Sequence, residues 1–69
     1  MTISYNKLWK LMIDKGYPNK SDLRTITGIG TNTLAKLSKN QIVSLDVLMK
    51  ICIALDCNIG DICEFVQEK

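Results

Sequence analysis

Apolar side chains recur every three or four residues along most of the chain, which is the period of an amphipathic helix. No segment keeps the strict alternation of a half-buried strand for more than a few residues. Five segments show the helical pattern, and they lie at residues 5–13, 20–27, 31–38, 45–55 and 59–66. The pattern therefore predicts an all-α domain in which five short helices surround one core.

Residues that begin or end helices separate these segments. Ser and Asn side chains can accept a hydrogen bond from a backbone N–H group in the first turn of a helix. The expected N-caps are Ser4, Asn19, Ser44 and Asn58, and Gly16 is expected to end the first helix.

The helical period also predicts which side chains face the core. In the first segment five apolar residues share a face, namely Tyr5, Leu8, Trp9, Met12 and Ile13. In the last segment the shared face consists of Ile59, Ile62, Cys63 and Val66. The fourth segment is apolar on nearly all sides, which predicts a buried helix.

The length and composition limit the classes of function. The chain has 69 residues, of which 46% are apolar, and it contains a single Pro and no His. A domain of this size buries only about 60% of its unfolded surface, which leaves little room for an internal substrate cavity. We therefore expect one domain spanning residues 1–69 that is not an enzyme and takes no cofactor and no small-molecule substrate.

The cysteines and the first helix indicate the compartment. Cys52, Cys57 and Cys63 have the spacing of neither a two-disulfide framework nor a C-x2-C metal site, so we interpret them as buried thiols in a reducing environment. Lys7 and Lys10 interrupt the apolar residues near the start, which argues against a signal peptide or a membrane span. The expected location is the cytoplasm, with no membrane partner and no bound metal.

Charge is unevenly distributed although the net charge is only +2. Residues 1–43 contain seven basic and two acidic side chains, whereas residues 44–69 contain two basic and five acidic ones. This asymmetry favours an anionic partner at one end of the molecule. Lysines on solvated helix faces would produce the same pattern, so charge alone leaves both interpretations open.

The most informative stretch is residues 20–37. Gly28 and Ile29 lie between two segments of about two turns each, so the chain must bend sharply there. We expect Gly28 to adopt a positive φ, Ile29 to fill the corner, and Leu34 to pack on Leu23. This is the geometry of a helix-turn-helix, although a helical hairpin in any small bundle would also need a glycine at its corner.

At this stretch the sequence resembles the phage-repressor helix-turn-helix family, which includes lambda repressor and Cro and the xenobiotic-response-element type. The matching segments are KSDL at residues 20–23, GIG at 28–30 and TNTLAKL at 31–37, and the similarity continues through residues 44–62. The resemblance implies a five-helix lambda-repressor-like domain whose second and third helices form the motif. Two positions depart from the family pattern, because Arg24 replaces a small residue and Thr27 replaces an apolar one. We expect Ile26 to take over part of the packing and Arg24 to keep its charge in solvent.

The resemblance implies that the third helix lies in the major groove of double-stranded DNA. The residues then expected to read bases are Thr31, Asn32, Ala35 and Lys36. Those expected to contact phosphates are Lys20, at the start of the second helix, together with Thr33, Lys39, Asn40 and Gln41. In the turn, Gly30 would serve as an N-cap that permits close approach of the backbone.

A single module of this kind buries roughly 600–1,000 Å² on DNA, which is little for tight specific binding. We therefore expect a homodimer, at least on DNA, on a palindromic site with half-sites about 34 Å apart. Ile53 and Phe65 lie off the inward faces of their segments and are the candidate dimer surface. Phe65 could instead fold back onto Trp9 or Tyr5.

The leading hypothesis is a small phage-repressor-like, sequence-specific DNA-binding transcriptional regulator that acts by occupying an operator. The alternative is a protein-interaction module, such as an antitoxin-like or adaptor protein, with weak or lost DNA binding. A thiol-dependent enzyme using Cys57 is a third class, and the sequence offers it neither a base partner nor a pocket.

Overall fold

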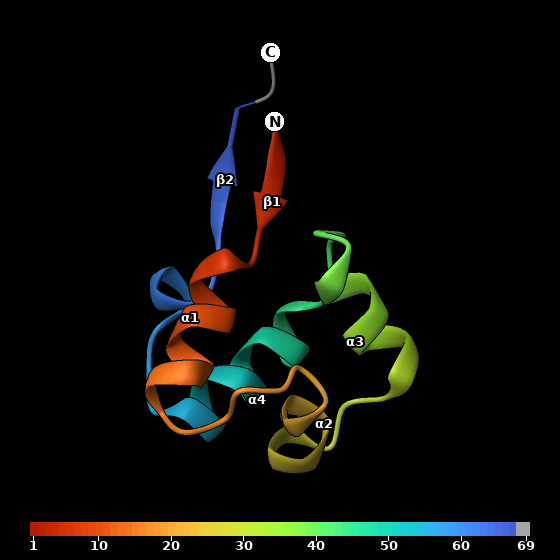
Figure 1. Cartoon of the computed structure of the whole chain (residues 1–69). Helices are drawn as coiled ribbons and strands as arrows, with labels where there is room; N and C mark the ends of the chain where they lie inside the picture. Colours follow the sequence, from red (N-terminus) through yellow and green to blue (C-terminus); the bar gives the residue numbers. More distant parts are fainter. Residues whose placement is uncertain (68–69) are drawn as a thin grey trace.

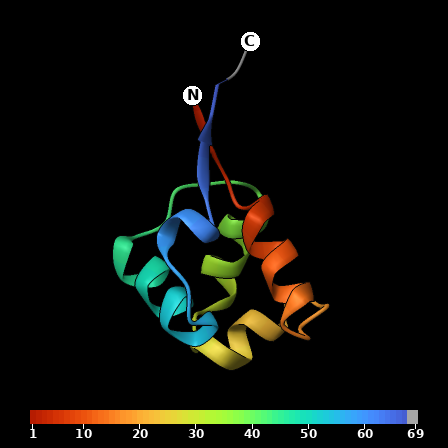
Figure 2. The same ribbon diagram turned by 90° about the vertical axis from the view of Figure 1, so that its left-hand side faces the viewer.

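The computed structural model describes residues 1–67 and places four α-helices in a single body from which two short strands project (Figure 1). In chain order the elements are β1 (Thr2–Ser4), α1 (Asn6–Asp14), α2 (Asp22–Thr27), α3 (Thr31–Ser38), α4 (Leu45–Leu55), the 3-10 turn η1 (Ile59–Asp61) and β2 (Glu64–Val66). The two strands bring the beginning and the end of the chain side by side, as two perpendicular views show (Figure 1, Figure 2).

The prediction of a fifth helix over residues 59–66 is wrong. Only η1 is helical there, and β2 pairs antiparallel with β1 so that Ile3 lies opposite Phe65. Strands of three residues are too short to show an alternating pattern, and their pairing joins segments about sixty residues apart along the chain. β-branched and aromatic side chains at residues 2, 3, 65 and 66 suit the strand conformation.

The helix ends match the predictions only in part. Ser4 lies in β1, and Tyr5 occupies the N-cap position of α1 without a side-chain hydrogen bond. Asn19 does not cap α2 either, because that helix begins after Ser21. The predicted cap of α4 is confirmed, since the Val47 N–H donates to Ser44 Oγ at 3.3 Å. At η1 the Asn58 N–H donates to an Asp61 carboxylate oxygen at 3.0 Å.

The core is built from apolar side chains contributed by every helix. The fully buried ones are Tyr5, Leu8, Met12, Leu23, Leu37, Ile51, Leu55 and Ile62. Trp9, Leu34 and all three cysteines pack against this cluster and are half-buried. The longest helix, α4, has 11 residues, and no helix within residues 1–67 is long and apolar enough to span a bilayer.

In α1 and α4, fewer residues face the core than the sequence predicts. Ile13 of α1 is exposed, while Leu11 is half-buried against the core. In α4 the buried residues are Leu48, Ile51 and Leu55, whereas other apolar residues of the helix face solvent, namely Leu45, Met49 and Ile53. A helix apolar nearly all round is fully covered only when neighbours surround it, and a domain of this size has too few elements to do so.

The sharp corner between α2 and α3 is present as predicted. Gly28 follows α2 with a φ of 76°, in the left-handed region, and its N–H donates to the Arg24 carbonyl oxygen at 2.8 Å. Ile29 is buried beneath the corner, and Gly30 is the N-cap of α3. Glycine adopts this left-handed conformation without the steric cost that any Cβ would bring.

Replacing Gly28 by Ala should therefore lower the free energy of unfolding by about 1–2 kcal/mol, the cost of left-handed backbone for an L residue. No atom lies within 4 Å of the added Cβ, so the loss would come from backbone conformation alone. Urea unfolding followed by circular dichroism measures it. The matched control is Gly60→Ala, whose Cβ also meets open space but whose φ is not left-handed. Equal stability of the two variants would contradict the prediction.

Candidate nucleic-acid interface

The outward face of α3 is polar and fully accessible. The four residues predicted to read bases are all exposed, namely Thr31, Asn32, Ala35 and Lys36. On the opposite side Leu37 is buried and Leu34 is half-buried, so the core holds α3 by its apolar face. The helix lies at the edge of the helical body (Figure 1). The fold therefore leaves the predicted reading surface free.

A hydroxyl at the end of α2 fixes the corner that leads into α3. The Thr27 hydroxyl donates to the Leu23 carbonyl oxygen and accepts a hydrogen bond from the Ile29 N–H at 3.3 Å. This gives a physical reason for a threonine where the family pattern has an apolar residue. As expected, the Arg24 side chain is exposed and Ile26 packs partly against the core.

The predicted phosphate-binding residues are not equivalent in the structure. Lys39 is exposed at the C-terminal end of α3, whereas Thr33 is half-buried. Lys20 lies in the turn before α2 and not within the helix, with its Nζ 4.6 Å from the centroid of the Trp9 ring. At that distance the ammonium group makes a cation–π contact. Lys20 would have to leave the Trp9 ring to reach a phosphate.

Asn40 and Gln41, also predicted to contact phosphates, have a structural role that the sequence did not reveal. Asn40 adopts a φ of 55°, and its Oδ1 accepts a hydrogen bond from the buried Tyr5 N–H at 3.2 Å. The Tyr5 hydroxyl donates to the Gln41 carbonyl oxygen at 2.8 Å. Burial raises the pKa of the Tyr5 hydroxyl above its ordinary value. One signal was available in the sequence, because an Asn just after a helix tolerates left-handed backbone.

The surface around α2 and α3 carries basic side chains without acidic partners. Arg24, Lys36 and Lys39 are exposed, and none forms an ion pair with another residue in 1–67. The ion pairs found in that range join Lys7 to Glu64 at 3.6 Å and Lys50 to Asp46 at 3.4 Å. Three positive charges without acidic partners among residues 1–67 therefore lie on α2, on α3 and at the C-terminal end of α3.

The cysteines have no feature of a reactive site. Burial, and then the neighbouring Cys52 thiol, raise the pKa of Cys57 to about 11. Burial also raises the pKa of Cys63. A thiol nucleophile needs a substantial thiolate population at neutral pH. The environment of Cys57 opposes this, which disfavours the thiol-dependent enzyme.

Both residues of the predicted dimer surface are exposed. Ile53 faces solvent on α4, and Phe65 faces solvent on β2 next to its strand partner Ile3. Phe65 has not folded into the core near Trp9 or Tyr5, which was the other expectation.

Comparison with known proteins gives a consistent picture. A model of the Cro/C1-type HTH DNA-binding domain matches residues 7–68. The crystal structure of the transcriptional regulator VanUg is similar to this chain with a TM-score of 0.91 and 51% sequence identity, and the match covers 97% of this chain and 88% of that one. A search of curated proteins found no match.

The contacts of Asn40 lead to a test of its role. Asn40→Ala should lower the free energy of unfolding by about 1–3 kcal/mol, because it leaves the buried Tyr5 N–H without an acceptor. Chemical denaturation measures the change. Asn40→Asp keeps the acceptor oxygen and should recover most of the lost stability. If the alanine variant is as stable as the wild type, the Tyr5 contact does not hold the end of α3.

Proposed function

The chain belongs to the Cro/C1-type HTH DNA-binding domain family, and from that premise we propose that it is a sequence-specific transcriptional regulator that binds operator DNA through α3. The observation that carries this proposal is the exposed polar face of α3, which an apolar face anchors to the core. In the proposed complex α3 lies in the major groove and its first turn approaches the base edges.

The side chains on that face have the chemistry needed to distinguish bases. The Asn32 amide can donate its N–H to adenine N7 and accept a hydrogen bond from adenine N6–H at its oxygen, and the Lys36 ammonium can donate to guanine O6 and N7. The methyl groups of Thr31 and Ala35 can contact the thymine methyl. All four positions are exposed and lie within one and a half turns of α3.

Phosphate contacts would hold α3 in place. Lys39 extends from the C-terminal end of the helix, and the exposed residues Asn40 and Gln41 follow directly. Gly30 caps α3 without a side-chain hydrogen bond, so the first N–H groups of the helix are available to a phosphate oxygen. Thr33 and Lys20 complete the proposed set, with Lys20 released from Trp9 on binding.

We further propose that two copies bind a palindromic operator and repress transcription by occupying it. A single module buries too little surface for tight specific binding, and two modules on adjacent helical turns overcome this limit. The cytoplasm is the proposed location, because its reducing conditions keep thiols such as those of Cys52, Cys57 and Cys63 free.

A second candidate is a protein-interaction module with weak DNA binding, of the antitoxin or adaptor type. The exposed apolar residues of α4 and β2 favour it, since such surfaces mark contacts with other proteins. Selection of bound oligonucleotides from a random pool separates the two candidates. A common, palindromic sequence supports the regulator, whereas binding that falls steeply with salt but shows no preferred sequence supports the interaction module.

Asn32→Ala should relax the base preference at one position of each half-site by about 1–3 kcal/mol while the salt dependence stays nearly constant, because the residue is placed to contact a base and not a phosphate. Repeating the selection with the variant measures this. Asn6→Ala, at an exposed asparagine of α1, is the matched control and should keep the wild-type preference. An unchanged preference in the Asn32 variant would remove it from the reading surface.

Lys39→Ala should weaken binding to all sequences and reduce the slope of log affinity against log salt concentration by about one, the value for one lost phosphate contact. Binding titrations at several salt concentrations give the slope. Lys50→Ala is the control, because Lys50 is also exposed but pairs with Asp46 on α4. Equal slopes for the two variants would show that Lys39 does not contact the backbone of DNA.

A further inference from the structure

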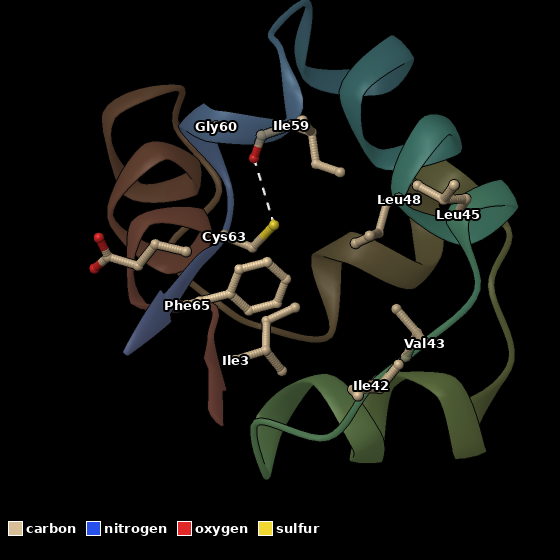
Figure 3. A pocket seen from close by; sticks show the side chains of 10 residues that line it. Ile3, Ile42, Val43, Leu45, Leu48, Ile59, Gly60, Cys63 and Phe65 are labelled. Atoms are coloured by element: carbon tan, nitrogen blue, oxygen red, sulfur yellow. Dashed lines mark hydrogen bonds between the residues drawn. The ribbon is translucent and has the colours of Figure 1, made fainter. Parts of the chain in front are cut away.

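The hollows of the surface have no excess of positive charge. The hollow between the two-stranded sheet and the start of α4 is lined by apolar side chains (Figure 3). Its one charged lining residue is Glu64, which pairs with Lys7 at 3.6 Å. An open, polar hollow between α1 and the segment after α4 has three basic and three acidic lining residues, namely Lys7, Lys10, Lys15, Asp14, Asp56 and Asp61. The outward face of α2 differs from both.

That face presents one positive charge and no negative one. Ser21, Arg24 and Thr25 are exposed on it, while Leu23 faces the core. Arg24 forms no ion pair with another residue in 1–67. Asp22, the acidic residue of α2, is half-buried, and residues two positions apart in a helix do not face each other. The surface therefore consists of a free guanidinium group between two residues with hydroxyl groups.

Arg24 lies close to the start of α3. Its carbonyl oxygen accepts the Gly28 N–H at 2.8 Å, so it lies one turn before the corner, and α3 begins three residues after Gly28. The two helices contact each other across this corner (Figure 1). The family pattern has a small residue in place of Arg24, yet the corner forms here with an exposed arginine. Arg24 thus adds a charge to this surface without filling the space between the helices.

A guanidinium group on α2 is suited to a phosphate. Its planar fork of N–H donors matches two phosphate oxygens, and serine and threonine hydroxyl groups also donate to phosphates. When the second helix of a helix-turn-helix lies in the major groove, the first helix crosses the sugar-phosphate backbone. A charge on α2 near the corner then meets phosphate groups and not base edges.

We propose that Arg24 is a further DNA-contacting residue of this chain, whose guanidinium group binds a backbone phosphate beside the groove that α3 enters. The inference rests on the proposed function, because α3 in the groove is what brings α2 to the backbone. The contact is not one that the family pattern implies, since a small side chain does not reach a phosphate. With eight residues, α3 is about 12 Å long. Arg24 near its start and Lys39 at its end therefore bind different phosphates and hold the helix at both ends.

The test replaces Arg24 by Gln, which keeps a long polar side chain and removes the charge. Binding is titrated on two duplexes of equal length, one with the sequence selected from the random pool and one with that sequence scrambled. Arg24→Gln should bind both roughly tenfold more weakly, the value of one hydrogen bond to a charged group. The slope of log affinity against log salt concentration should fall by about 0.9.

Lys10→Gln is the matched control. Lys10 is exposed on α1, forms no ion pair within residues 1–67 and lines the charge-balanced hollow, so its loss should leave the slope unchanged. Arg24→Lys keeps the charge but not the planar fork. It should therefore keep the wild-type slope and recover part of the lost affinity.

Duplexes with a single neutral methylphosphonate linkage locate the contact. The wild type should lose affinity wherever the neutral linkage replaces a contacted phosphate. Arg24→Gln should become insensitive at one of these positions and Lys39→Ala at a different one. If both variants become insensitive at the same position, the proposal is wrong.

Arg24→Ala is a second variant that restores the small side chain of the family pattern and uses the strongest helix former, so it should fold and show the same fall in slope. Circular dichroism checks the folding of each variant. Either variant with the slope and affinity of Lys10→Gln overturns the proposal. So does a changed base preference when the selection is repeated, which would place Arg24 on a base edge. Loss of folding in both variants also overturns it, because Arg24 would then be a packing residue.

This proposal and the proposed function fail in different ways. If the wild type selects a common sequence and the Arg24 variants bind like Lys10→Gln, only the Arg24 contact is refuted. If the wild type shows no preferred sequence but the slope falls in Arg24→Gln, the backbone contact of α2 stands and the sequence-specific regulator is refuted. A wild-type chain that binds neither duplex refutes both.

Discussion

The left-handed backbone at Gly28 determines the direction in which α3 leaves the core. The Gly28 N–H closes α2 on the Arg24 carbonyl, and the Thr27 hydroxyl bridges the Leu23 carbonyl and the Ile29 N–H across the bend. Ile29 is buried beneath the same bend. Hydrogen bonds and one apolar side chain thus fix the corner together, and they hold the start of α3 with its polar residues exposed.

The other end of α3 is held by the first helix. Tyr5 is buried, donates its backbone N–H to Asn40 Oδ1 and donates its hydroxyl to the Gln41 carbonyl oxygen. Since Tyr5 directly follows β1, these bonds connect the sheet, α1 and the end of α3. A helix of eight residues is short, and short helices gain their stability mainly from tertiary contacts. Fixation at both ends is what makes the polar face of α3 a rigid surface.

Local signals in the sequence predicted the features that local chemistry determines. A glycine at a bend, a serine before an apolar run and a four-residue apolar period were sufficient for the corner at Gly28, the cap at Ser44 and the extent of α4. The β1–β2 sheet was not predicted, because it depends on pairing between the two ends of the chain. Strands of three residues are too short to show an alternating pattern. The side chain of Asn40 was assigned to DNA because its distant partner, the Tyr5 N–H, cannot be read from spacing. The accessible face of α3 was predicted correctly. Leu34 and Leu37 must face the core, so the residues on the opposite side of the helix face solvent.

The small size of the domain explains why apolar side chains of α4 remain exposed. Four short helices cannot surround α4, so Leu45 and its neighbours remain outside the core. The segment that leaves α3 passes within four residues from Lys39, through the anchor at Asn40, to the exposed Ile42. The hydrogen bonds of Tyr5 to Asn40 and Gln41 therefore fix the loop that connects the end of α3 to the exposed apolar side chains of Ile42 and Leu45.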